Sequence, residues 1–137
     1  MMKVISVFLL FCCCTLLSLP TIAQKKPEKT PKTTRILFLL DGSGSMRATW
    51  DGRQRIDIAR EILLDITDSL TQQPNIEVAL RVYGHQFDRR YQNCTDSKLE
   101  VSFAPNNYAN VRSTLSRLTP QGVTPIAYSL EQATKDF

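Results

Sequence analysis

Three oxygen-bearing side chains, Asp41, Ser43 and Ser45, stand at alternate positions directly after an apolar run. A carboxylate and two hydroxyls are hard donors, and Gly42 and Gly44 make the turn between them flexible. Oxygen donors that share a single negative charge suit Mg²⁺ or a similar hard cation, which keeps some waters and avoids thiolates. The sequence therefore predicts a metal site at these three residues.

The apolar run at residues 36–40 has to position those donors. A short apolar run without a break is typical of a strand that is buried on both faces, in the middle of a parallel sheet. The polar cluster then lies at the carboxyl end of the strand, where open α/β sheets place their ligand crevice.

The rest of the chain predicts an α/β layout in the order β-α-β-β-α-α. The last two of the three strands are separated by a polar excursion at residues 85–98 without a helix, so we expect an antiparallel hairpin with a long tip. A sheet of three strands is undersized, which suggests a fragment. The expected strands are 36–40, 76–83 and 99–103, and the expected helices are 56–72, 108–118 and one that starts near Pro125.

All three predicted helices have an apolar side, that of the second comprising Tyr108, Val111, Leu115 and Leu118, and a turn precedes the first helix. Asp51-Gly52 in the polar loop at residues 48–55 is a turn signal. The apolar side of the first helix is predicted to comprise Ile56, Ala59, Ile62, Leu63, Ile66 and Leu70, and that of the third helix Ala127, Leu130 and Ala133.

Residues 1–23 have the pattern of an export signal, with a basic start, an apolar stretch and a cleavage site after Ala23. A retained membrane anchor remains an alternative, as does lipidation at Cys12, Cys13 or Cys14, although the bulky Phe11 argues against a lipobox. Residues 24–34 are polar, rich in lysine and twice interrupted by proline, which predicts a disordered linker.

The charge balance gives little support to nucleic-acid binding. The chain has 137 residues and a net charge of +4, but five of its basic residues lie between residues 25 and 35. Residues 36–137 carry eleven basic and twelve acidic side chains, with no basic stripe among aromatic residues. Contact with a membrane is expected only through the signal or an uncleaved anchor.

The segment Asp41-Gly42-Ser43-Gly44-Ser45 resembles the D-x-S-x-S signature of the von Willebrand factor type A domain. Residues 122–126, Gly-Val-Thr-Pro-Ile, resemble the G-x-T-P-[IL] segment of many bacterial members. The resemblance implies a Rossmann-like, doubly wound sheet that is mostly parallel with one antiparallel edge strand. Residues 35–137 would form the first half to two-thirds of such a domain, incomplete at its C-terminus.

The resemblance also implies a metal-ion-dependent adhesion site for Mg²⁺, with Mn²⁺ or Ca²⁺ as alternatives. Ser43 and Ser45 would be hydroxyl ligands, Asp41 a direct or water-mediated ligand, and Thr124 a further hydroxyl ligand. A family aspartate would lie beyond Phe137. Capping is the structural alternative, a helix N-cap for Thr124 and a turn or helix cap for the two serines.

The motifs of other kinds of functional site do not match this sequence, each at an identifiable residue. A dinucleotide fingerprint needs glycine where Arg47 stands, and a P-loop needs Gly-Lys before serine or threonine. A nucleophile elbow around Ser43 needs glycine at Asp41 and Ser45. An aspartyl phosphatase needs an acid at Ser43, and an EF-hand needs acids or amides at both serines. The single histidine, His85, is expected to be a loop or hydrogen-bonding residue.

Cys94 would be left without a partner after signal cleavage. Its surroundings, Tyr83-Gly84-His85 and Asn93-Cys94-x-Asp96, resemble an exported bacterial branch of the family. The resemblance implies a disulfide to a cysteine beyond residue 137, and a free surface thiol is the alternative.

Taken together, these features predict an exported protein-binding module that is not an enzyme. Its partner would be a protein that offers a carboxylate to the metal, in the periplasm, on the cell surface or in the medium. The alternative is a structural or scaffolding subunit that docks onto an enzyme or a transport complex.

Overall fold

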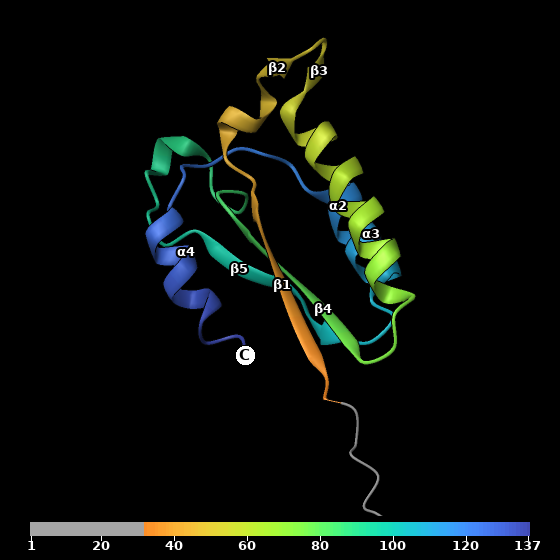
Figure 1. The fold of residues 1–137 in the computed structure, drawn as a ribbon. Helices are drawn as coiled ribbons and strands as arrows, with labels where there is room; N and C mark the ends of the chain where they lie inside the picture. Colours follow the sequence, from red (N-terminus) through yellow and green to blue (C-terminus); the bar gives the residue numbers. More distant parts are fainter. Residues whose placement is uncertain (1–31) are drawn as a thin grey trace, which may run out of the picture. The chain divides into compact units, whose positions relative to one another are not determined.

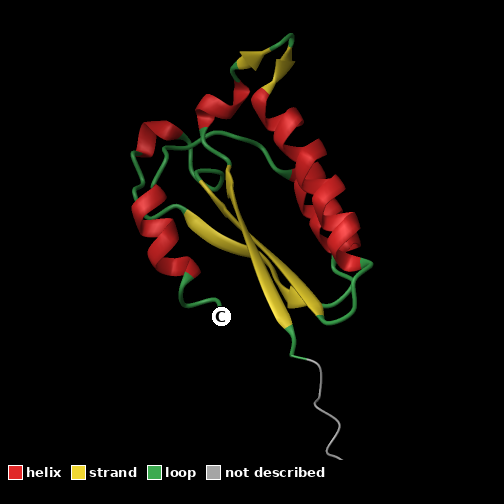
Figure 2. Ribbon diagram, in the orientation of Figure 1, coloured by secondary structure: helices red, strands yellow, loops and turns green. Residues whose placement is uncertain are grey.

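The computed structural model describes residues 32–137, so the predicted signal peptide, its cleavage site after Ala23 and most of the predicted linker lie outside the described residues. Thr34, assigned to the linker, is the first residue of a strand. The elements, shown in Figures 1 and 2, are β1 (Thr34–Asp41), η2 (Gly44–Arg47), β2 (Thr49–Trp50), β3 (Arg53–Gln54), α2 (Arg55–Thr71), β4 (Ile76–Tyr83), η3 (Arg89–Tyr91), β5 (Ser97–Ala104), α3 (Tyr108–Arg117) and α4 (Ile126–Ala133).

Three strands form the main sheet, in the order β1–β4–β5. β1 and β4 are parallel and in register up to Asp41 opposite Tyr83, and β5 pairs antiparallel with β4. The predicted hairpin and the α/β class with an antiparallel edge strand are therefore confirmed. None of the helices between residues 32 and 137 has the length and apolar character that a membrane span requires.

The prediction that residues 36–40 lie in the middle of the sheet is wrong for the described residues. Within residues 32–137, β1 pairs with β4 alone, and only Leu40 of this run is buried. The reason is geometric, because the other edge of β1 has no strand beside it in this part of the chain. The apolar side chains of the run therefore keep part of their surface exposed.

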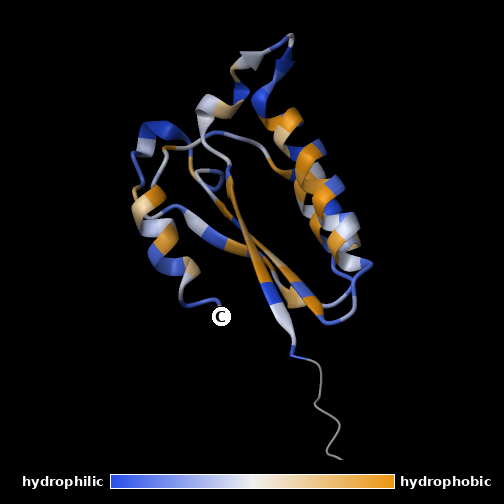
Figure 3. Cartoon of the chain, in the orientation of Figure 1, coloured by the Kyte–Doolittle hydropathy of each residue, from blue (hydrophilic) through white to orange (hydrophobic). Residues whose placement is uncertain are grey.

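Helices α2 and α3 cover one face of the sheet and α4 lies on the other (Figure 1). Alternate residues of β4 point toward α2 and α3, as expected for a strand with side-chain period two. Burial of each such aliphatic side chain stabilises the fold by about 1.5–3 kcal/mol. The core, which Figure 3 shows as facing orange segments, includes Val78, Leu80, Val82, Ile56, Leu63, Val111 and Leu115.

The predicted apolar sides of α2 and α4 are only partly correct. Ile62 and Ile66 are 54% and 43% exposed. They line a groove beside β1, whose free edge leaves them uncovered. On α4 the buried residue is Ser129, whose hydroxyl donates to the Pro125 carbonyl oxygen at 2.8 Å, whereas Leu130 is 55% exposed.

A buried ion pair fastens the last residues of the chain to the sheet. Arg81 on β4 donates through Nε and Nη2 to the two carboxylate oxygens of Asp136, both at 2.6 Å, and through Nη1 to Ser97 Oγ at 3.1 Å. Phe137 packs on Phe103 of β5 with ring centroids 5.0 Å apart. These contacts hold the segment after α4 against the face of the sheet opposite α2.

The polar loop at residues 48–55 is a small hairpin of strands β2 and β3, which sequence patterns did not predict. Asp51 and Gly52 occupy its turn with φ values of 51° and 74°, so the predicted turn is confirmed. Two consecutive residues with positive φ are typical of the tight turns that match the twist of a two-stranded ribbon.

Candidate metal centre

The loop after β1 brings the three predicted donors together. The Asp41 carboxylate accepts a hydrogen bond from the Ser43 backbone N–H through Oδ1 at 2.7 Å, which folds the chain back at the end of the strand. The 3₁₀ helix η2 then places the Ser45 hydroxyl 2.9 Å from that of Ser43. Ser43 is buried and Ser45 is exposed, so the cluster opens to solvent on the Ser45 side.

This donor set fits a hard divalent cation. Adjacent ligands of an octahedral Mg²⁺ ion, with bonds of about 2.1 Å, lie about 3 Å apart, and the two serine hydroxyls are 2.9 Å apart. One carboxylate and two hydroxyls match the preference of Mg²⁺ for oxygen. Residues 32–137 contain no group of three histidines, cysteines or acids that could hold a metal, so a centre in this region would depend on hydroxyl oxygens.

Tyr83, at the end of β4, faces the first donor across the sheet register. Burial of its side chain, together with the nearby Asp41 carboxylate, raises the pKa of Tyr83 to about 12. The phenol therefore stays neutral at physiological pH and adds no negative charge beside the carboxylate. A backbone hydrogen bond also joins the loop after β1 to the end of β4, since Gly42 N donates to Tyr83 O at 2.7 Å.

Gly84 allows the loop after β4 to approach the other two loops closely. Its φ is +69°, and a Cβ built there would lie 2.2 Å from the Val123 carbonyl oxygen and 3.0 Å from Ser43 Cα. Only glycine avoids both the strain of positive φ and this overlap. The loop that carries Ser43 and the segment that precedes Thr124 are thus both packed against Gly84.

The segment before α4 crosses the end of the sheet where β1 and β4 finish (Figure 1). Gly122 forms an isolated parallel bridge with Ser43, and Gln121 N donates to Gly42 O at 3.1 Å. This pairing brings Gln121 and Gly122 alongside the first loop.

Thr124 is exposed next to this segment. Among residues 32–137, no hydrogen bond of its hydroxyl is found, and α4 begins at Ile126 with Pro125 as N-cap and without a side-chain cap. The alternative role of Thr124 as a helix cap is therefore not observed. Its role as a metal ligand stays a prediction, as do the roles of Asp41, Ser43 and Ser45.

Asp96 supports the loop after β4 and was not singled out by sequence patterns for this role. It is 1% exposed, and its Oδ2 accepts hydrogen bonds from the backbone N–H groups of Gln86 at 3.0 Å and Phe87 at 3.1 Å. A Cβ on Gly122 would lie 3.0 Å from the same oxygen. A buried carboxylate that binds backbone N–H groups fixes the path of the loop, but only the folded loop reveals its partners.

His85 is a hydrogen-bonding residue, as predicted. Its Nε2 lies 2.9 Å from Glu100 Oε1, which also binds Lys98 Nζ at 2.9 Å. Burial pushes the pKa of Glu100 upward, but hydrogen bonds from Lys98 and His85 outweigh this effect and hold it below its usual range. Gln121 Nε2 donates to His85 O at 2.8 Å, so this residue also joins two loops.

Cys94 lies in the same excursion and is exposed, with its Sγ 3.6 Å from Gln92 O. Among the cysteines, it alone falls within the described part of the chain, where it is free. The disulfide to a cysteine beyond residue 137 stays a prediction.

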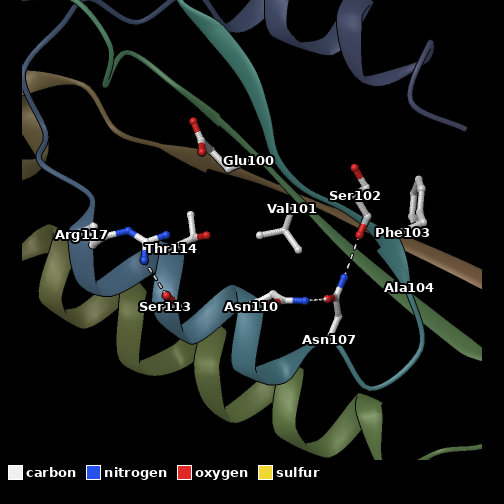
Figure 4. A pocket seen from close by; sticks show the side chains of 10 residues that line it. All are labelled: Glu100, Val101, Ser102, Phe103, Ala104, Asn107, Asn110, Ser113, Thr114 and Arg117. Carbon is white, nitrogen blue, oxygen red and sulfur yellow. Dashed lines mark hydrogen bonds between the residues drawn. The ribbon is translucent and has the colours of Figure 1, made fainter.

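A polar groove of about 420 Å³ lies between β5 and α3 (Figure 4). None of the residues that line it belongs to the candidate metal centre. Two pairs of the groove's side chains bond each other. Asn110 Nδ2 donates to Asn107 Oδ1 at 2.7 Å, and Arg117 Nη1 donates to Ser113 Oγ at 2.7 Å. The groove shows no carboxylate and hydroxyl cluster comparable with Asp41, Ser43 and Ser45.

Comparison with known families decides the identity of this fold. The family model of the von Willebrand factor type A domain matches residues 36–137. The chain belongs to this family. The VWA domain therefore covers all the described strands and helices except the start of β1. The family predicted from the sequence is confirmed.

Curated relatives of this VWA chain include two uncharacterized proteins of Bacillus subtilis (strain 168). YwmD is 30% identical over 122 residues, covering 86% of this chain and 52% of YwmD. YwmC is 28% identical over 126 residues, covering 88% and 55%. The chain thus spans about half the length of these relatives.

Solved structures share the fold of this VWA domain. BatB from Bacteroides thetaiotaomicron matches with a TM-score of 0.58 and 21% identity over 75% of this chain and 45% of BatB. The VWA domain of the pili tip protein Mfa5 from Porphyromonas gingivalis matches with 0.60 and 16%, over 77% and 32%. The minor pilin PilB from Streptococcus sanguinis matches with 0.58 and 22%, over 80% and 28%.

Proposed function

We propose that this VWA domain is an exported, metal-dependent protein-binding module. The observation that carries the proposal is the convergence of Asp41, Ser43 and Ser45, with the two hydroxyls 2.9 Å apart at the open end of the sheet. The backbone contacts of Gln121 and Gly122 with the same loop support Thr124, two residues further along the chain, as a fourth oxygen donor.

Each residue has a distinct task in this proposal. Ser43, held by its backbone bridge, and Ser45, open to solvent, would hold the ion through their hydroxyls. Asp41 would neutralise part of the charge, while Tyr83 stays uncharged beside it. A bound Mg²⁺, Mn²⁺ or Ca²⁺ ion with so few negative ligands supplies an electrophilic position that suits a carboxylate of a partner protein.

Binding rather than catalysis is favoured by the residues around the centre. Among the described residues near the serine cluster, the one histidine is His85, and its Nε2 is already engaged by Glu100. Two structures with the same fold are a pili tip protein and a minor pilin, which supports a role in protein contacts outside the cell. The export pattern of residues 1–23 agrees with this location.

The proposal is tested with a displayed library of random peptides, selected on the full-length mature protein in Mg²⁺ and eluted with EDTA. The full-length protein is used because the family resemblance implies a further ligand beyond residue 137. We expect the eluted peptides to share an aspartate or glutamate and to lose binding to Asp41→Ala. Asp65→Ala, on the exposed side of α2, is the matched control and should bind as the parent does.

Two results would reject the metal-dependent function. One is a selected set without enrichment of acidic residues. The other is peptide binding that persists in EDTA and in Asp41→Ala, which would favour the scaffolding alternative, because docking through a preformed surface needs no ion.

A further inference from the structure

A hollow of about 500 Å³ lies between the β2–β3 hairpin and the start of α2, and its lining residue Met46 directly follows Ser45. We call it the Trp50 hollow. Its lining is mostly apolar and comprises Met46, Trp50, Arg55, Ile58, Ala59 and Ile62. The hairpin projects beyond the N-terminal end of α2 (Figure 1).

Trp50 is unusually accessible for its size. It is 67% exposed. Trp50 also lines a second hollow with Asp51, Arg53 and Ile58, so its side chain borders two surface depressions. Large exposed aromatic side chains beside apolar grooves are characteristic of interaction surfaces, where tryptophan often dominates the binding energy.

The positive charge at the Trp50 hollow comes mainly from Arg55. Residues 44–61 carry four arginines and three acids, Asp51, Asp57 and Glu61. Arg47 Nε donates to the Pro120 carbonyl oxygen and Arg53 pairs with Glu61 on the surface, whereas Arg55, which lines the hollow, takes part in no ion pair among the described residues. This charge favours an acidic partner segment.

The Trp50 hollow and the candidate metal centre are formed by residues that are neighbours in the sequence. Ser45, the exposed donor, is followed directly by Met46, which lines the hollow, and both lie in the same turn of η2. A partner segment with a carboxylate at the serine cluster therefore has an apolar surface beside it.

We propose that the Trp50 hollow receives a bulky apolar side chain from the same acidic partner segment whose carboxylate binds at the candidate metal centre. This inference rests on the proposed function and specifies its partner, an acidic protein segment with a large aliphatic or aromatic residue close to its carboxylate. Arg55 and the neighbouring hydroxyl cluster favour this occupant over a second copy of the chain.

Trp50 is the single tryptophan of the sequence, so its fluorescence reports on the hollow directly. The probes are short blocked peptides of glycine and serine that carry one glutamate and one leucine at varied separations. Matched peptides carry alanine in place of leucine. With the full-length mature protein in Mg²⁺, we expect at least one leucine peptide to bind about tenfold more tightly than its alanine match and to shift the Trp50 emission to shorter wavelength.

Variants separate the hollow from the metal centre, with binding followed by titration calorimetry. Trp50→Ala should remove the preference for leucine and retain the weaker, Mg²⁺-dependent binding of both peptides. Tyr91→Ala is the matched control, since Tyr91 is an equally exposed aromatic residue (71%) outside the hollow, and it should behave as the parent.

Three outcomes would overturn the inference, and they identify which proposal fails. Equal Mg²⁺-dependent binding of leucine and alanine peptides, unchanged by Trp50→Ala, rejects the hollow and leaves the proposed function intact. A leucine preference that persists in EDTA and in Asp41→Ala rejects the coupling to a metal. The absence of any Mg²⁺-dependent peptide binding rejects both.

Discussion

Ser43 and Gly122 form a parallel β-bridge that joins the loop after β1 to the loop before α4. Gly44 N donates to Gly122 O at 2.9 Å, and Gly122 N donates to Gly84 O at 2.8 Å. One residue thus connects the three loops at this end of the sheet through backbone groups. These contacts fix the backbone of Ser43 and Gly44 whether or not a ligand is bound.

Gly84→Ala tests the packing of these loops. The new Cβ would overlap the Val123 carbonyl oxygen, 2.2 Å away, so we expect unfolding to require about 3 kcal/mol less free energy. Gly52→Ala is a matched control, with a similar φ of +74° but no atom within 4 Å of its Cβ, and should lose only about 1 kcal/mol. Urea unfolding followed by circular dichroism measures both. Equal losses would show that the loops are not closely packed.

Asp96→Asn tests the buried carboxylate behind the loop. The replacement weakens the acceptor for the Gln86 and Phe87 N–H groups and places an amide donor against them, with an expected loss of about 2 kcal/mol. Amide hydrogen exchange at residues 86 and 87 should accelerate more than in the exposed control Asp65→Asn. Unchanged exchange at these two amides would contradict the assigned role.

The lowered pKa of Glu100 predicts how the stability of the fold depends on pH. Its pKa is lowered in the folded state by Lys98 and His85, so its ionised form stabilises the fold. This stabilisation is present above its usual pKa of about 4.5 and is lost as the pH falls through the lowered value. Glu100→Gln should therefore flatten the stability profile at acidic pH, measured by urea unfolding at successive pH values. A profile as steep as that of the parent would contradict this prediction.

The ion pair of Arg81 and Asp136 predicts a large effect of single substitutions. Its side chains are 9% and 7% exposed, so Asp136→Asn leaves a buried guanidinium without its counter-charge, at a cost of about 3 kcal/mol. Replacing both residues together, as Arg81→Met with Asp136→Leu, should cost less than the single change. Thermal unfolding compares them. A double variant that loses as much as the sum of Arg81→Met and Asp136→Leu made singly would rule out coupling.

Periodicity predicted the elements well because local residues dictate them. Helix α3 begins at Tyr108, as expected from Pro105-Asn106-Asn107, and β4 has the predicted bounds of Ile76–Tyr83. The exposure of Ile62 and Ile66 was not predictable, because it depends on the free edge of β1. A pattern of apolar residues shows which side chains are suited to burial and not which neighbours cover them.

The candidate site was predictable only in part, for a similar reason. Asp41, Ser43 and Ser45 are close in the sequence, so their spacing alone brought them together. The parts played by Asp96, Gly84 and Tyr83 depend on contacts between loops distant in the sequence, and no local pattern carries that information. The β2–β3 hairpin was missed because strands of two residues have no periodicity to detect.

The most direct test of the account is Mn²⁺ binding to the full-length mature protein, followed by electron paramagnetic resonance of the free ion. The account predicts one bound Mn²⁺ per chain that Mg²⁺ displaces, with binding lost in Asp41→Ala and retained in Asp65→Ala. Absence of binding, or binding that Asp41→Ala leaves unchanged, would contradict the assignment of the metal centre to Asp41, Ser43 and Ser45.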